Sequence, residues 1–254
     1  MDRKELEGYK LRTGFNLNQQ EKDYFQHLLL LFIASKTTSL VFKGGTALQK
    51  AYGLQRFSED LDFCERVENE HRLKVFDEAA EWLESQGYRC ELARAPNPFG
   101  DGASGRFLIE GVLFDGSSRS KCSVRFDLSL RKDLLMPAQA LAIKPIYSDM
   151  LSYVLPIMQL EEIAAEKIRA IWQRNQVRDV YDLHFLLQKG ANLEPEIVRQ
   201  KMALCKEIPD WGDIRKKINQ QAKSWNSLDM LTKNKPAWEE VFPFLDSRLP
   251  KGKI

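Results

Sequence analysis

Two strand patterns flank a glycine turn between residues 40 and 63, and this order constrains the fold of the chain more than any other feature. Leu40–Lys43 is a short apolar run typical of a buried strand, and Gly44-Gly45 follows it directly. Ala47–Tyr52 is then expected to form a short helix. From Phe57 to Phe63 the pattern has period two, which indicates a second strand. The segment therefore predicts a strand, a turn, a helix and a strand in close succession.

Polar groups suited to a metal and a phosphate gather in this segment. Asp60 and Asp62 fall on one face of the predicted second strand, opposite its apolar residues. Such a pair suits Mg2+, which takes ligands from one or two carboxylates and from substrate phosphates. Glycines at positions 44 and 45 let backbone N–H groups approach a phosphate, and Thr46 adds a hydroxyl. A solvated acidic turn is the alternative for the aspartates alone, but together with the turn they predict a magnesium–nucleotide site.

The same segment resembles the nucleotidyltransferases that share their fold with DNA polymerase β, whose signature is a Gly-Gly or Gly-Ser turn followed by a strand with Asp-x-Asp. A longer form resembles specifically the AbiEii/AbiGii-type toxins of type IV toxin–antitoxin and abortive-infection (phage defence) systems. The matching residues are Lys43-Gly44-Gly45-Thr46-Ala47-Leu48 and Arg56-Phe57-Ser58-x-Asp60-Leu61-Asp62-Phe63. The resemblance implies that Asp60 and Asp62 hold metals, that residues 43–46 seat phosphates, and that Arg56 and Ser58 contact the triphosphate.

The remainder of the first half predicts a mixed domain of helices and strands. Helical spacing covers residues 18–35 and 71–86, and strand patterns cover residues 88–95, 106–114 and 123–130. The glycine-rich stretch 96–105 lacks the Gly-Lys-Ser/Thr ending of a P-loop and no helix pattern follows it. It is therefore predicted to be a long hairpin connection.

Asp127 is the candidate for a third carboxylate. It lies on the polar face of the strand predicted over 123–130, whose other face is apolar. In polymerase-β-type enzymes a carboxylate on a neighbouring strand completes the metal site. By that resemblance Asp127 would bind the catalytic metal and help to take the proton from the attacking hydroxyl. The alternative is an exposed aspartate paired with Arg125 or Arg131.

A second motif lies between residues 160 and 187. Leu160–Arg174 is amphipathic, and Lys167 projects from the middle of its apolar stripe. A buried lysine is unfavourable unless an anion meets it, although it can instead extend along its stem to the surface. Its own helix offers no acidic partner on that face, which favours a triphosphate. Asp179 and Asp182 open the next helix, where the helix dipole by itself favours acids.

This motif is also similar to the AbiEii-type toxins, which carry a Glu-x-x-x-x-x-Lys helix followed by an Arg/Lys-Asp-x-x-Asp-Leu block. The resemblance implies that Lys167 contacts the nucleotide phosphates. It also implies that either Asp179 or Asp182 supports the active site, and it does not choose between them.

The composition argues against several other classes of protein. A hydrophobic content of 43% with 29% charged residues is ordinary for a globular protein, and a net charge of +2 is far below that of a dedicated nucleic-acid-binding domain. The longest apolar run is too short to cross a bilayer, and no secretion signal precedes it. The four cysteines are scattered without Cys-x-x-Cys spacing, which argues against a zinc site or a disulfide framework. We therefore expect a cytoplasmic protein.

The combined expectation is an α+β chain. A nucleotidyltransferase core with a mixed sheet and flanking helices covers residues 1–150, and a helical domain over 151–254 completes the active-site cleft. The resemblance implies Mg2+ (or Mn2+), an NTP as substrate, and NMP transfer to an RNA hydroxyl at the 3′ end of tRNA. It further implies growth arrest and a separately encoded antitoxin. The alternatives are nucleotidylation of a protein or small molecule, and a non-catalytic homologue that binds a nucleotide or an antitoxin.

Overall fold

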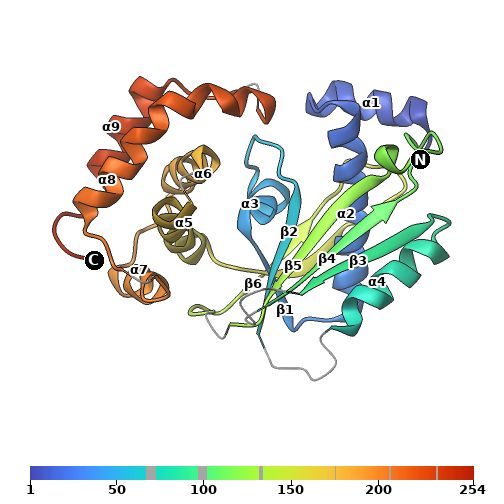
Figure 1. Ribbon diagram of the computed structural model, residues 1–254, viewed down its shortest axis with the longest axis horizontal. Coiled ribbons are helices and arrows are strands. Elements are labelled where there is room, and N and C mark those ends of the chain that lie inside the picture. Colours follow the sequence, from blue (N-terminus) through green and yellow to red (C-terminus); the bar gives the residue numbers. More distant parts are fainter. Residues whose placement is uncertain (67–72, 97–101, 132–133, 175, 206, 233) are drawn as a thin grey trace. The chain divides into compact units, whose positions relative to one another are not determined.

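The computed structural model describes residues 1–66, 73–96, 102–131, 134–174, 176–205, 207–232 and 234–254 (Figure 1). The chain forms two compact units. Unit 1 comprises Met1–Gly53, Phe57–Leu134 and Ala138–Ile157, and unit 2 comprises Leu54–Arg56, Leu135–Pro137 and Met158–Ile254.

The division falls after Ile157, whereas the sequence suggested a boundary near residue 150. The difference arises because Tyr153–Ile157 is a strand, β7, that pairs with two other strands of unit 1. Residues 135–137 belong to unit 2 because the carboxylate of Glu162 accepts the backbone N–H groups of Leu135 and Met136 at 2.9 and 2.8 Å.

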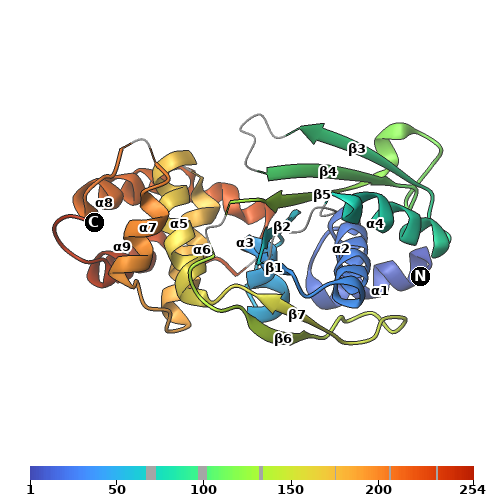
Figure 2. The ribbon, with the colours of Figure 1, turned by 90° about the horizontal axis from the view of Figure 1, so that it is seen from below.

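A seven-stranded mixed sheet forms the centre of unit 1 in the part of the chain that the structure describes (Figure 2). Its order is β3-β4-β5-β2-β1-β7-β6. The β2–β5 and β1–β7 pairs are parallel and the other pairs are antiparallel. The strands are β1 Leu40–Lys43, β2 Asp60–Glu65, β3 Cys90–Pro96, β4 Gly102–Ile109, β5 Cys122–Ser129, β6 Gln139–Ile143 and β7.

Unit 1 also contains helices α1 (Arg3–Thr13), α2 (Leu17–Lys36) and α4 (Lys74–Ser85). Both α1 and α2 begin with a capping box, in which the N-cap side chain and the third helical residue satisfy each other's backbone N–H groups. Helix α2 packs beside α4 (Figure 1), and it has buried residues on nearly all sides. Such a helix is normally apolar throughout, so the polar residues that α2 buries need partners.

A short helical segment connects β1 to the loop before β2. Helix α3 (Gly44–Ala47) starts immediately after β1 and continues as a π-helical turn, η1 (Leu48–Tyr52), which ends at Gly53 with a φ of +81°. The helix predicted over residues 47–52 is therefore present, but it begins three residues earlier, at the glycines themselves. Single π-turns inside helices are rare and occur often at functional sites.

Unit 2 is helical, as the sequence predicts. Its elements are α5 Leu160–Arg174, α6 Val177–Gln188, α7 Pro195–Met202, α8 Trp211–Gln220, the 3-10 segment η3 Gln221–Met230, and α9 Trp238–Arg248. Fully buried aliphatic residues on several of these helices, such as Ile163, Leu183, Ile214 and Val241, form its interior. No helix among the described residues has the length and apolarity needed to span a bilayer.

Most predicted elements of unit 1 are confirmed, with local corrections. The hairpin between β3 and β4 exists, but β3 extends to Pro96 and β4 begins at Gly102. The rest of the predicted connection, residues 97–101, lies outside the described residues. The predicted strand over 106–114 ends at Ile109. Helix α1 and strands β6 and β7 were not predicted.

Candidate active site

One face of the sheet brings the predicted metal-binding aspartates together. Asp60 and Asp62 are partly exposed on β2, while Leu61 and Phe63 between and after them are fully buried on the other face. Asp62 lies in register with Asp127 of β5. Residues in register on adjacent strands share a face, and the strands lie about 4.8 Å apart. The third carboxylate is therefore next to the pair.

A guanidinium group, however, already binds this third carboxylate. Arg125 lies in register with Asp60, and its Nε donates to Asp127 Oδ1 at 3.0 Å. The alternative pairing of Asp127 with Arg125 is thus what the structure contains. Within the described ranges, no group of three or more His, Cys, Asp or Glu side chains is arranged to hold a metal ion. Among these carboxylates, Asp127 is the one that Arg125 neutralises.

The donor set nevertheless suits Mg2+. That ion needs only one or two protein carboxylates when substrate phosphates supply further oxygens, and Asp60 with Asp62 meets this requirement. A cation that displaces Arg125 from Asp127 would gain a third carboxylate on the same face.

The glycine turn lies directly against this carboxylate face. Gly44 has a φ of +75°, a left-handed conformation that favours glycine. A β-carbon at this position would collide with the Oδ2 atom of Asp62. Lys43, the residue before the turn, is buried and in register with Asp62. The turn and the aspartate therefore come together only because residue 44 has no side chain.

The hydroxyl groups of Thr46 and Ser58 form hydrogen bonds within unit 1. Thr46 is fully buried, and its Oγ1 donates to the backbone carbonyl of Asp60 at 2.5 Å and lies 2.8 Å from Ser58 Oγ. A hydroxyl carries one hydrogen, so the Ser58 hydroxyl is the donor between the two. These bonds join α3 to the start of β2. The phosphate contacts that the resemblance implies for both residues stay predictions.

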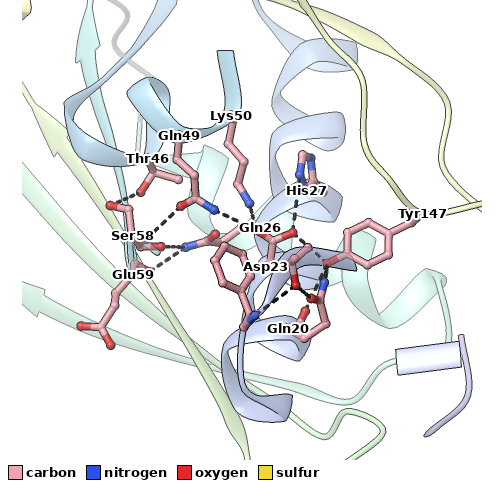
Figure 3. A network of polar contacts seen from close by, with 12 residues as sticks. Gln20, Asp23, Gln26, His27, Thr46, Gln49, Lys50, Ser58, Glu59 and Tyr147 are labelled. Carbon is pink, nitrogen blue, oxygen red and sulfur yellow. Dashed lines mark hydrogen bonds and ion pairs between the residues drawn. The ribbon is translucent and has the colours of Figure 1, made fainter. Parts of the chain in front are cut away.

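A buried polar network lies behind the turn (Figure 3). Gln49 of η1 accepts the backbone N–H of Ser58 through Oε1 at 2.8 Å and donates to Asp23 Oδ1 at 3.2 Å. Lys50 forms an ion pair with the same Asp23, and Tyr147 donates to its other oxygen at 2.7 Å.

Sequence reasoning did not find this network, although one signal was available. Helix α2 carries Gln20, Asp23, Gln26 and His27 at helical spacing, and all four side chains are buried. A polar stripe in an otherwise apolar helix indicates a buried hydrogen-bonding partner elsewhere in the chain.

The charges of this network follow from burial and proximity. Burial raises the pKa of Asp23, but Lys50, His27 and the hydrogen bond from Tyr147 together lower that pKa below its usual value. Burial lowers the pKa of Lys50 despite its attraction to Asp23. Burial, together with the Lys50 charge, lowers the pKa of His27 to about 3, so His27 is neutral at pH 7. The ion pair next to the turn is Asp23 with Lys50, and His27 is its neutral neighbour.

The second motif forms an alternating chain of charges within unit 2. Lys167 contacts Asp179 at 2.9 Å and Asp182 at 2.7 Å. Arg56 binds Asp182 through two hydrogen bonds of 2.6 Å, and Arg174 binds Asp179 through two of 2.8 Å. Lys167 is thus paired with both aspartates. The aspartates differ in their second partner, which is Arg56 for Asp182 and Arg174 for Asp179. The acidic partner that α5 lacks on its own face is supplied by α6.

All four buried members of this chain are charged at neutral pH. Burial opposes ionisation of Asp182, but Arg56 and Lys167 lower its pKa below the usual value. Lys167 and Arg174 likewise outweigh burial and lower the pKa of Asp179. The two carboxylates, acting against burial, raise the pKa of Lys167.

The chain is similar to a known protein family and to known structures. The profile of the family described as nucleotidyl transferase AbiEii toxin, type IV TA system, matches residues 29–243. MenT4, a nucleotidyltransferase toxin from Mycobacterium tuberculosis H37Rv, has a TM-score of 0.60 at 22% identity, with 91% of this chain and 82% of that chain covered. JHP933 from Helicobacter pylori has a TM-score of 0.55 at 18% identity, with 92% and 91% covered. At these identities the two structures show a shared fold alone. No curated protein matches the chain.

Proposed function

The chain belongs to the AbiEii family of nucleotidyltransferase toxins of type IV toxin–antitoxin systems, and we propose that it transfers an NMP from an NTP to an RNA hydroxyl. The acceptor is the 3′ end of tRNA, and the cofactor is Mg2+, with Mn2+ as a substitute. The modified tRNA no longer serves translation, so the outcome is growth arrest. A separately encoded antitoxin protein is the partner that relieves it.

One observation carries this proposal: the glycine turn abuts the carboxylate of Asp62 on the face that Asp60 and Asp127 share. A phosphate bound by backbone N–H groups at Gly44 and Gly45 would lie next to carboxylates that can hold its counter-cation. This is the arrangement that a metal–triphosphate complex requires.

Each residue then has a defined role. Asp60 and Asp62 would hold the metal ion, which would neutralise the triphosphate and polarise the acceptor oxygen. Asp127 is the third ligand and takes the proton from the acceptor hydroxyl as its oxygen bonds to the α-phosphorus. The bond from that phosphorus to the bridging oxygen breaks, and pyrophosphate leaves. By resemblance, Lys43, Thr46, Arg56 and Ser58 bind phosphates.

The resemblance also assigns Lys167 to the triphosphate and one of Asp179 and Asp182 to its support. In unit 2 the lysine is paired with both aspartates, so either would orient its ammonium group. These assignments remain part of the proposal.

The test is a labelling experiment with each α-labelled NTP, Mg2+, and either total tRNA or cell lysate. The parent is expected to label tRNA, and Asp60→Ala and Asp62→Ala to abolish the label. Glu59→Ala is the matched control, because this neighbouring carboxylate is 52% exposed and precedes β2, which begins at Asp60. Label in protein instead of RNA would show that the acceptor is a protein and not tRNA. Absence of label with every NTP would refute the proposal.

A second pair of variants tests the role of Asp127. Asp127→Asn should lower kcat by about 100-fold or more if this carboxylate accepts the proton. Arg125→Ala removes the cation that holds it, so half-maximal activity should require less Mg2+. An unchanged Mg2+ requirement would exclude Asp127 as a metal ligand.

A further inference from the structure

The segment that leads into β2, the strand with Asp60 and Asp62, accepts and donates hydrogen bonds through several of its backbone atoms. Gln49 accepts the N–H of Ser58, and the amide nitrogen of Gln26 donates to the carbonyls of Ser58 and Glu59, both at 2.9 Å. Thr46 donates to the carbonyl of Asp60. Every residue from 58 to 60 therefore has a backbone group that is hydrogen-bonded to a side chain outside the strand. Figure 3 shows these bonds at Ser58 and Glu59.

Gln49, like Thr46, connects the glycine-turn segment to the segment that leads into β2. It lies on η1, which continues the helical segment beginning at Gly44, and its Oε1 binds Ser58 two residues before Asp60. The amide of Gln49 thus adds to the Thr46 bonds a further link between the segment that starts with the glycine turn and the segment that carries Asp60 and Asp62.

The side chain of Gln49 is also hydrogen-bonded to a buried ion pair, which Asp23 and Lys50 form. The Nε2 of Gln49 donates to Asp23 Oδ1, and the ammonium of Lys50 pairs with the same oxygen. The side chains of Asp23 and Lys50 are 6% and 2% exposed. Because a buried pair of this kind resists displacement, the amide of Gln49 has one orientation, with its oxygen toward Ser58.

We propose that Gln49 is a positioning residue that sets the distance between the glycine turn and the carboxylates of Asp60 and Asp62. This rests on the proposed metal–triphosphate chemistry at that face. Gln49 touches neither metal nor phosphate. It acts through the backbone of Ser58, and a misplacement of the carboxylates by about 1 Å is enough to slow such a reaction about 100-fold.

The test compares Gln49→Met with Gln20→Met. Gln20 belongs to the same buried network and also makes two side-chain hydrogen bonds, to Tyr147 and from Thr13, both at 2.5 Å. Its side-chain hydrogen bonds are to Thr13 and Tyr147 and not to residues 58–60. Methionine keeps the length of both side chains and removes both bonds. A third variant, Gln49→Glu, keeps an oxygen that can accept from Ser58 but sets a carboxylate against Asp23.

Three quantities are measured for each protein: the melting temperature, the affinity for Mn2+ from its EPR signal with and without a non-hydrolysable ATP analogue, and kcat for NMP transfer. Both methionine variants should lose similar thermal stability. Only Gln49→Met should bind Mn2+ about tenfold more weakly and lower kcat between about 10-fold and about 100-fold. Gln49→Glu should recover part of kcat while being no more stable than Gln49→Met.

The outcomes separate this inference from the proposed function. If kcat and Mn2+ affinity follow the melting temperature across all variants, Gln49 is merely structural and the inference is wrong. If the parent shows no NMP transfer, a selective loss of Mn2+ affinity in Gln49→Met still supports positioning while the proposed reaction fails. A parent that binds no Mn2+ overturns both.

Discussion

Replacing Lys167 by methionine should destabilise unit 2 strongly, whatever role the lysine has toward a nucleotide. Its side chain is 7% exposed and lies between two carboxylates that are fully buried. After the replacement Asp182 keeps the buried guanidinium of Arg56, whereas Asp179 keeps only Arg174, which is 50% exposed. Asp179 is then a buried charge whose remaining partner is largely solvated.

The magnitude follows from the burial of the pair. Removing one partner of a buried ion pair typically costs about 3–5 kcal/mol, because the other charge stays buried without compensation. Domains are stable by about 5–15 kcal/mol in total. With a urea dependence of about 2 kcal/mol per M, the unfolding midpoint should fall by about 2 M.

Urea unfolding followed by tryptophan fluorescence suits this measurement, because Trp172, Trp211, Trp225 and Trp238 all belong to unit 2. Lys216→Met is the matched control. Lys216 is 75% exposed and pairs with Asp213 on the surface, so its loss should leave the midpoint unchanged.

A double variant identifies the cause. Lys167→Met with Asp179→Asn removes the uncompensated carboxylate and should recover about 1–3 kcal/mol relative to the single variant. An unchanged midpoint in Lys167→Met would refute the reasoning, because it would mean that the lysine contributes nothing to folding. Weaker NTP binding at full stability would then assign Lys167 to the substrate alone.

Three further predictions follow from burial and backbone geometry. Gly44→Ala and Gly53→Ala both place alanine at positive φ, which costs about 1–2 kcal/mol, but only the former collides with Asp62, so only the former should abolish NMP transfer. The pKa of His27 is about 3 when folded and 6.5 in its ordinary state, so the folded form binds fewer protons and stability should fall as pH drops from 6.5 toward 3. Between pH 6.5 and pH 5 this amounts to about 2 kcal/mol, and a His27→Asn variant with the same pH slope in urea unfolding would contradict it. Lys201→Met leaves a fully buried glutamate without its 2.7 Å partner and should cost about 3–5 kcal/mol by the same assay, whereas an unshifted midpoint would show that the pair is unimportant.

Much of the fold was predictable because it depends on local patterns. Strand β1, helices α2, α4, α5 and α6, and the opposite faces of β2 follow from hydrophobic periodicity, which any chain segment displays by itself. Strands β6 and β7 were missed because they are short and β7 includes Pro156, a residue that weakens a strand pattern. The matched family profile confirms the resemblance that residues 43–63 and 160–187 indicated.

The sequence by itself determined the class of chemistry in this protein. A glycine turn and an Asp-x-Asp strand are encoded within a short window, because positive φ at Gly44 and the alternation around Asp60 are properties of the local backbone. Tertiary structure alone decided which groups meet there: β5 pairs with β2 so that Asp127 lies beside Asp62, Gln49 holds Ser58, and α6 supplies carboxylates to Lys167. The physical reason is that a hydrogen bond or ion pair depends on the packing of separate elements, and spacing along one element does not contain that information.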